Sequence, residues 1–196
     1  MRTPSKRTLL GTASAVAAVM LALACGLGGK GGGNTDNAGA TTTPGSPTTP
    51  DSADLCTAAE LTITAQEGPS GSTHRSVILI FTNSSSAPCS TKGFPAVNLL
   101  DGSDTILEAA AQSPSGYLGG LGDGVDAPQL VLNPGDQASA MVETEAINDD
   151  GTSCTPYAAM QVWPPFNVGK DPVKVTWVGD GCSAPQVHAV VAGTTG

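Results

Sequence analysis

Short stretches in which apolar and polar residues alternate, or in which a few apolar residues run together, recur from about residue 61 to residue 190. Successive side chains of a β-strand point to opposite faces of a sheet, so a period of two is typical of strands. Gly, Pro, Asn and Asp separate the stretches, as expected for turns. The pattern predicts nine short strands, at residues 61–65, 74–82, 96–100, 105–109, 129–132, 137–144, 159–163, 173–177 and 186–190.

The connections between these stretches favour antiparallel pairing. Residues 101–104 read Asp-Gly-Ser-Asp and residues 133–136 read Asn-Pro-Gly-Asp, and both are turn sequences. No stretch has the period of an amphipathic helix, and residues 111–127 form only a long Gly-rich loop. We therefore predict an all-β, antiparallel β-sandwich over residues 54–192, followed by a flexible tail at residues 193–196.

The beginning of the chain has the pattern of an export signal. Arg2, Lys6 and Arg7 are followed by an uncharged, mostly apolar stretch that ends at Ala24. This order of basic and apolar segments is typical of secretory signals, and we predict a signal peptide at residues 1–24. The apolar run of about 16 residues is short for a membrane-spanning helix, which needs about 20.

Residues 22–26, Ala-Leu-Ala-Cys-Gly, resemble the lipobox of bacterial lipoproteins, in which the cysteine receives a diacylglyceryl group. Two acyl chains suffice for stable anchoring. The chain has five cysteines, and an odd cysteine in an exported protein needs an explanation, which lipidation of Cys25 supplies. Ordinary cleavage near Ala24, which would release a soluble protein, is the alternative. Residues 25–53 hold the lipidated Cys25 and a Gly/Thr/Pro-rich linker that is too poor in apolar side chains to fold.

The four other cysteines, Cys56, Cys89, Cys154 and Cys182, form an even set. In an exported chain such a set indicates two disulfides. Three connectivities are possible, and the sequence separations favour Cys56–Cys89 and Cys154–Cys182. A zinc site is the competing interpretation, but neighbouring cysteines lie 28 or more residues apart and no Cys-x-x-Cys pair occurs.

Charge narrows the range of partners. The chain carries a formal net charge of −9, and residues 54–192 alone hold 15 acidic and 4 basic residues, a net charge of −11. Binding to nucleic acid requires clustered Lys and Arg, so we expect no nucleic-acid partner. The predicted partner is the membrane, through the lipid, with a cell-wall or other envelope component as a second possibility.

Four cysteine- and proline-containing elements occur in a fixed order. They are Asp54-Leu-Cys56, the segment from Asn83 to Cys89 that continues to Gly93-Phe-Pro95, Leu132-Asn-Pro-Gly135, and Cys154 followed by a strand and Pro164-Pro165. The series resembles the actinobacterial family known as domain of unknown function 4232, over most of residues 54–192. The resemblance implies an immunoglobulin-like sandwich on an exported protein or lipoprotein. The family has no established activity, so the resemblance implies no catalytic residue.

A search for catalytic or ligand-binding chemistry identifies few candidates. No nucleophile elbow occurs, and the only histidines, His74 and His188, fall in predicted strands. A copper site would have to combine these histidines with Met141 and Met160 through the fold. A calcium site would use loop carboxylates at Asp123, Asp126, Asp149 and Asp150, without the spacing of an EF-hand.

These observations leave two hypotheses for the function. The first is a lipid-anchored, non-enzymatic binding or structural module on the extracellular face of the cell membrane, with no catalytic residues, metal or cofactor. The second is a hydrolase or metal-binding protein whose site is assembled only in the fold. The positions of His74 and His188 distinguish the two hypotheses, since a catalytic histidine must lie beside a partner residue in a pocket open to substrate.

Overall fold

The computed structural model describes residues 53–196. These residues form strands and connecting loops, with no helix among them. The larger sheet has the order β1-β2-β8-β11-β6, and β12 also pairs with β8. Its strands are β1 (Leu61–Glu67), β2 (His74–Asn83), β6 (Ala111–Gln112), β8 (Gln137–Glu145), β11 (Ser183–Val187) and β12 (Val191–Ala192).

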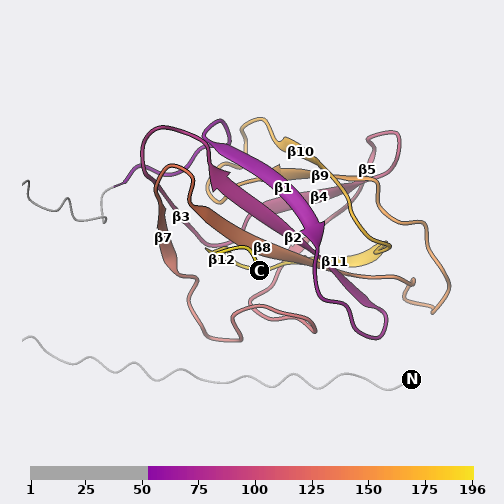
Figure 1. Ribbon diagram of the computed structural model, residues 1–196. Coiled ribbons are helices and arrows are strands. Elements are labelled where there is room, and N and C mark those ends of the chain that lie inside the picture. The colour runs from indigo at the N-terminus through magenta and orange to yellow at the C-terminus, as the bar shows by residue number, and fades with distance from the viewer. Residues whose placement is uncertain (1–52) are drawn as a thin grey trace, which may run out of the picture. The chain divides into compact units, whose positions relative to one another are not determined.

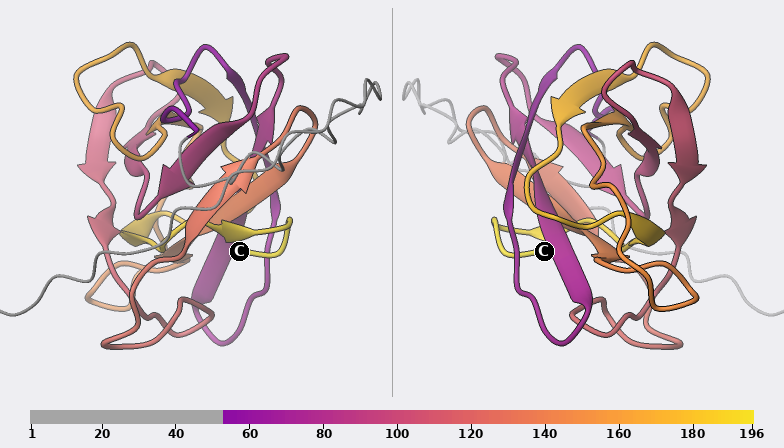
Figure 2. Two further views of the ribbon diagram at one scale, coloured as in Figure 1. Left: turned by 90° about the vertical axis from the view of Figure 1, so that its left-hand side faces the viewer. Right: turned by 90° about the vertical axis from the view of Figure 1, so that its right-hand side faces the viewer.

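A second sheet has four strands in the order β10-β9-β4-β5. Its members are β4 (Ala96–Leu100), β5 (Ile106–Ala109), β9 (Ala159–Trp163) and β10 (Val173–Thr176). A two-stranded sheet pairs β3 (Cys89–Lys92) with β7 (Gln129–Leu132). All pairs between these strands are antiparallel except β11 with β6, which is parallel. The predicted all-β sandwich is therefore confirmed (Figures 1 and 2).

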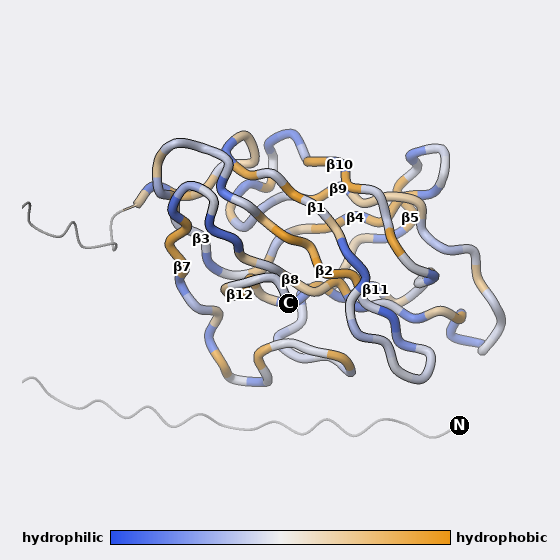
Figure 3. The backbone as a smooth tube through the Cα atoms, viewed as in Figure 1, coloured by the Kyte–Doolittle hydropathy of each residue, from blue (hydrophilic) through white to orange (hydrophobic). Residues whose placement is uncertain are grey.

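The core lies between the two larger sheets and is formed by apolar side chains at alternate strand positions. Figure 3 shows hydrophobic residues along the strands of both sheets. In β2 the inward residues are Val77, Leu79 and Phe81, each at most 1% exposed. In β4 and β9 they include Leu99 and Met160, both fully buried. Burying one such side chain stabilises the fold by about 1.5–3 kcal/mol relative to leaving it in water.

Strand β8 is buried on both faces, which is unusual for a strand of a two-layer sandwich. Ala138, Ala140 and Val142 face the core, as their alternation predicts. The intervening residues Ser139 and Met141 are also buried, because the C-terminal residues and the loop after β6 cover the outer face. The loop after β6 thus acts as a third layer over part of the sheet.

The nine predicted strands all occur, eight of them within two residues of their predicted bounds, whereas the last lies at Ser183–Val187 rather than at residues 186–190. Three short strands, β3, β6 and β12, were not predicted. They contain two to four residues and lack an apolar alternation, so only their partners define them. The turn at residues 133–136 closes with Gly135 at φ +87°, as the Pro-Gly sequence predicts.

Both predicted disulfides form. The Cα atoms of Cys56 and Cys89 lie 4.8 Å apart, and those of Cys154 and Cys182 lie 5.8 Å apart. The first bond ties the segment before β1 to β3, and the second ties the segment before β9 to the residue before β11. Each bond is confined to one half of the domain, as the sequence separations indicate.

Residues 193–196 contact the larger sheet. The Thr194 carbonyl accepts a hydrogen bond from the Gln66 side chain at 3.1 Å, and the Gly196 amide donates to the Ser139 hydroxyl at 2.9 Å. No helix among residues 53–196 is long and apolar enough to cross a membrane. The predicted signal peptide, the lipidation site at Cys25 and the linker up to residue 52 lie outside the residues that the structure describes.

Candidate functional site

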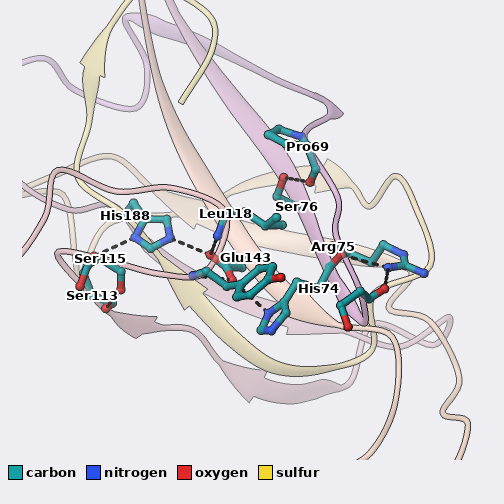
Figure 4. Close-up of polar contacts among 11 residues, drawn as sticks. Pro69, His74, Arg75, Ser76, Ser113, Ser115, Leu118, Glu143 and His188 are labelled. Carbon is teal, nitrogen blue, oxygen red and sulfur yellow. Dashed lines mark hydrogen bonds and ion pairs between the residues drawn. The ribbon is translucent and has the colours of Figure 1, made fainter.

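The two histidines of the chain meet at one buried carboxylate, Glu143 (Figure 4). Glu143 lies on β8, between β2 and β11 in the larger sheet. His74 is the first residue of β2, and His188 directly follows β11. The order of the strands, rather than proximity in the sequence, brings the three side chains together.

The contacts to Glu143 come from four groups. Its Oε1 lies 3.1 Å from His74 Nδ1, and its Oε2 lies 3.4 Å from His188 Nε2. The backbone amide of Tyr117 donates to Oε1 at 3.0 Å, and the amide of Leu118 donates to Oε2 at 3.1 Å. The side chains of Glu143 and His188 are only 4% and 2% exposed, so these contacts replace the water that a carboxylate otherwise requires.

The loop at residues 113–124, between β6 and β7, supplies the two amides and covers the cluster. The Tyr117 ring stacks on the His74 ring, with centroids 4.2 Å apart and an interplanar angle of 10°. At Gly120, which has φ +103°, a Cβ atom would come within 2.5 Å of the Pro114 carbonyl oxygen, so this position of the loop needs a glycine. The segment predicted only as a Gly-rich loop thus covers this part of the sheet, where Glu143 binds its backbone amides, and residues 113–124 are called the cover loop below.

Hydrogen bonding limits what His188 can do chemically. Its Nδ1 lies 2.9 Å from the Ser113 carbonyl oxygen, which can only accept, so Nδ1 carries a proton. A hydrogen bond between Nε2 and Glu143 Oε2 then needs a second proton, which lies between these two atoms. Both ring nitrogens are therefore engaged inside the protein.

A nucleophile is not provided at this cluster. Ser76 is the β2 residue paired with Glu143, but its hydroxyl donates to the Pro69 carbonyl at 2.6 Å. Within residues 53–196, no group of three or more His, Cys, Asp or Glu is arranged to hold a metal ion. The geometry is that of a polar clasp, in which a buried carboxylate holds a loop through two backbone amides.

The other residues considered for metal binding do not join this cluster, with the exception of Met141, which lies beside it under Gly119. Met160 is fully buried in the core, on the other sheet. The Asp123 carboxylate accepts a hydrogen bond from Ser115 at 2.8 Å, and the Asp150 carboxylate accepts from Thr152. Such short-range contacts are the usual role of Asp in turns.

One hollow lies away from this cluster, beside the loop between β9 and β10. It has a volume of about 590 Å³ and is lined by residues 57–59 and by Asn167, Gly169, Lys170, Asp171 and Val173. Phe166 and Val168 belong to the same loop and are 67% and 72% exposed. A second hollow of about 520 Å³ is polar and includes Glu108 and Asp149, and a third, of about 160 Å³, lies beside Arg75 and Asp180.

Sequence reasoning identified both histidines but missed their common partner. Glu143 is an acidic residue inside a strand whose neighbours are apolar, and that pattern is a weak signal for a buried carboxylate. Its pairing with two histidines depends on the order β2-β8-β11, which no local pattern encodes.

Comparisons with known proteins agree with the elements described above. No curated protein and no solved structure was found to match the chain. A family model, described as domain of unknown function (DUF4232), matches residues 56–195, which include every strand and both disulfides. The chain therefore belongs to the DUF4232 family.

Proposed function

We propose that this protein is a lipoprotein of the extracellular face of the cell membrane, anchored through Cys25, with a non-catalytic β-sandwich that serves as a binding or structural module. The observation that carries the proposal is the distribution of the five cysteines. Four of them pair in two disulfides of the folded domain, and the fifth directly follows the predicted signal peptide.

The disulfides support export because such bonds persist in oxidising compartments and are rare in the reducing cytosol. Cysteine parity then supports lipidation, because Cys25 is left without a role in the domain. The 28 residues from 26 to 53 would span about 30 Å as a flexible chain, enough to hold the domain near the membrane.

The non-catalytic assignment is supported by the state of the histidines. A general base must reach a substrate proton, directly or through one water. His188 is 2% exposed and uses both ring nitrogens within the protein. His74 is 25% exposed, but its ring stacks on Tyr117 and its Nδ1 contacts Glu143. A substrate could reach His188 only if the loop at residues 113–124 left this position.

The anchor can be tested by fractionating cells that express the full chain. We expect the wild-type protein in the membrane fraction, with a diacylglyceryl mass on the peptide that begins at Cys25. The Cys25→Ser protein should instead appear in the medium or be retained as the uncleaved precursor without the lipid mass. A Thr35→Ala protein, changed in the same linker, serves as the matched control and should fractionate as the wild type does. Membrane association of Cys25→Ser, together with an unmodified Cys25 in the wild type, would contradict the proposal.

A further inference from the structure

The loop between β9 and β10, residues 164–172, exposes two apolar side chains at its tip. Phe166 is 67% exposed and Val168 is 72% exposed, and these are the two largest exposures among the large apolar residues of the described domain. Neither side chain contributes much to the core, so their identities are not explained by folding. Exposed apolar residues that cluster on one loop are typical of an interaction surface.

The backbone of this loop adds a second observation. Phe166 has φ +64°, in the left-handed region that a bulky side chain rarely adopts. Asn or Gly would suit that conformation better, yet the chain places an aromatic ring there. Strained residues that the surrounding structure holds in place are frequent at binding sites.

The surroundings that hold the loop come from the beginning of the domain. Asn167 is 7% exposed, and its side-chain amide donates to the Cys56 carbonyl and to the Pro165 carbonyl, each at 2.9 Å. Its side-chain oxygen accepts from the Ala58 amide at 3.2 Å. The loop is therefore fastened to the segment that carries the Cys56–Cys89 disulfide.

This segment is also where the predicted linker reaches the domain. Residue 53 is the first that the structure describes, and Leu55, which is 51% exposed, precedes Cys56. Figures 1 and 2 both show the indigo start of the domain beside the amber loop between β9 and β10. A domain anchored through Cys25 thus presents Phe166 and Val168 at the end from which its anchor emerges.

We propose that Phe166 and Val168 insert into the outer surface of the lipid bilayer and dock this end of the domain on the membrane. The proposal rests on the lipid anchor proposed above. Two side chains bind a bilayer weakly by themselves, but a tether supplies a high local concentration of membrane and makes a weak contact effective. Within the loop the charges of Lys170 and Asp171 cancel, so the loop itself attracts neither anionic nor cationic lipids. The whole domain, residues 54–192, carries a net charge of −11. The surface fitted to this loop is therefore zwitterionic, because anionic lipids would repel the domain.

The docking can be measured without relying on lipidation in cells. The chain from Cys25 onward is coupled through the Cys25 thiol to a maleimide lipid in phosphatidylcholine vesicles that also carry a doxyl-labelled quencher. Phe166→Trp places a fluorophore at the proposed contact. Leu107→Trp places one on β5, at a side chain that is 50% exposed, and serves as the control. Each emission is corrected for Trp163 and Trp177 with the unsubstituted chain.

We expect the added tryptophan at position 166 to be quenched about twofold more strongly than the one at position 107, since Trp settles at membrane–water interfaces. Replacing part of the phosphatidylcholine with phosphatidylglycerol should reduce this difference, and Val168→Ser in the Phe166→Trp chain should reduce it further. Equal quenching at positions 166 and 107 would overturn the proposal. A protein partner would be identified instead if quenching is equal at the two positions and an envelope protein that co-purifies with the wild type is lost from Phe166→Ser cells. That result would also overturn the proposal. An unmodified Cys25 in cells would refute the anchor but leave the vesicle result unaffected.

Discussion

Single residues control how the cover loop is held on the sheet. Glu143 accepts hydrogen bonds from two backbone amides and lies between two imidazoles, with its side chain 4% exposed. Breaking a buried charged network from one side leaves its partners unsatisfied, which costs more than losing a surface contact. The side chains around Glu143 are therefore more sensitive to substitution than their positions on the outer face of a sheet suggest.

Glu143→Gln tests this sensitivity. An amide nitrogen replaces one carboxylate oxygen, so one backbone amide of the loop then faces a donor instead of an acceptor. We expect the free energy of unfolding to fall by about 3 kcal/mol in urea titrations. Glu145→Gln, two residues along the same strand at a more exposed position, should change it by less than about 1 kcal/mol. Equal losses in the two proteins would show that Glu143 is not a buried anchor.

Tyr157 gives a residue-scale prediction of pH dependence. The side chain is 4% exposed and its hydroxyl donates to Glu108 at 3.0 Å. Burial, together with this hydrogen bond and the negative charge of Glu108, raises the pKa of Tyr157 above its ordinary value of 10.0. The folded protein therefore keeps the phenolic proton at pH values where the unfolded chain loses it. The resulting stability is fully present below a pH of about 10 and is lost as the pH rises toward the folded pKa.

Tyr157→Phe removes this titration. We expect the free energy of unfolding of the wild type to fall more steeply between pH about 9 and about 11.5 than that of the variant, which starts lower because the hydrogen bond to Glu108 is gone. Urea titrations across this pH range measure the two slopes. Parallel slopes would contradict the role assigned to burial of Tyr157.

The short strand β3 depends on a disulfide for its stability, because it is too short to be stable through strand pairing alone. Strand β3 has four residues and pairs only with β7 in a two-stranded sheet. A two-stranded sheet is marginally stable in water by itself. The Cys56–Cys89 bond and the hydrogen bonds between the residues around Leu55 and Ser90 attach this small sheet to the segment before β1.

Removing that cross-link should therefore weaken one particular end of the domain. For a loop of 33 residues, we expect a Cys56→Ala, Cys89→Ala double variant to lose roughly 3–4 kcal/mol of stability in urea. Hydrogen exchange should accelerate most in β3 and β7. The Cys154→Ala, Cys182→Ala protein is the matched control, because its loop of 28 residues has a similar entropy while its local effect should fall near β9 and β11. Identical exchange patterns in both proteins would refute this assignment.

At the scale of the whole molecule, chemistry is unevenly distributed. At Glu143 the polar side chains are buried beneath a loop. In the loop beside the start of the domain, the apolar side chains of Phe166 and Val168 are exposed to solvent. A net charge of −11 over residues 54–192 disfavours contact with anionic surfaces. The vesicle experiment tests this arrangement, because its outcome depends on which end of the domain faces the bilayer when the chain is coupled through Cys25.

Much of the fold could be predicted because strands leave a local mark in the sequence. The alternation in residues 137–144 places Ala138, Ala140 and Val142 on one face, and the structure puts them in the core. The disulfide pairs followed from separation along the chain. The short strands β6 and β12 could not be predicted, because two residues are too few to show a period, and their partners alone define them.

Nine of the twelve described strands, the turn at residues 133–136, the favoured disulfide pairs and the predicted export signal could be read from the sequence, since each depends on residues near one another or on simple counting. The folded structure brings His74, His188 and Glu143 together and places a Gly-rich loop over them, and no local pattern indicated either arrangement. It also decided that Asn167 fastens an apolar loop to the start of the domain. These contacts join residues 25 to 111 positions apart, which become neighbours only through the order in which strands pair and sheets pack.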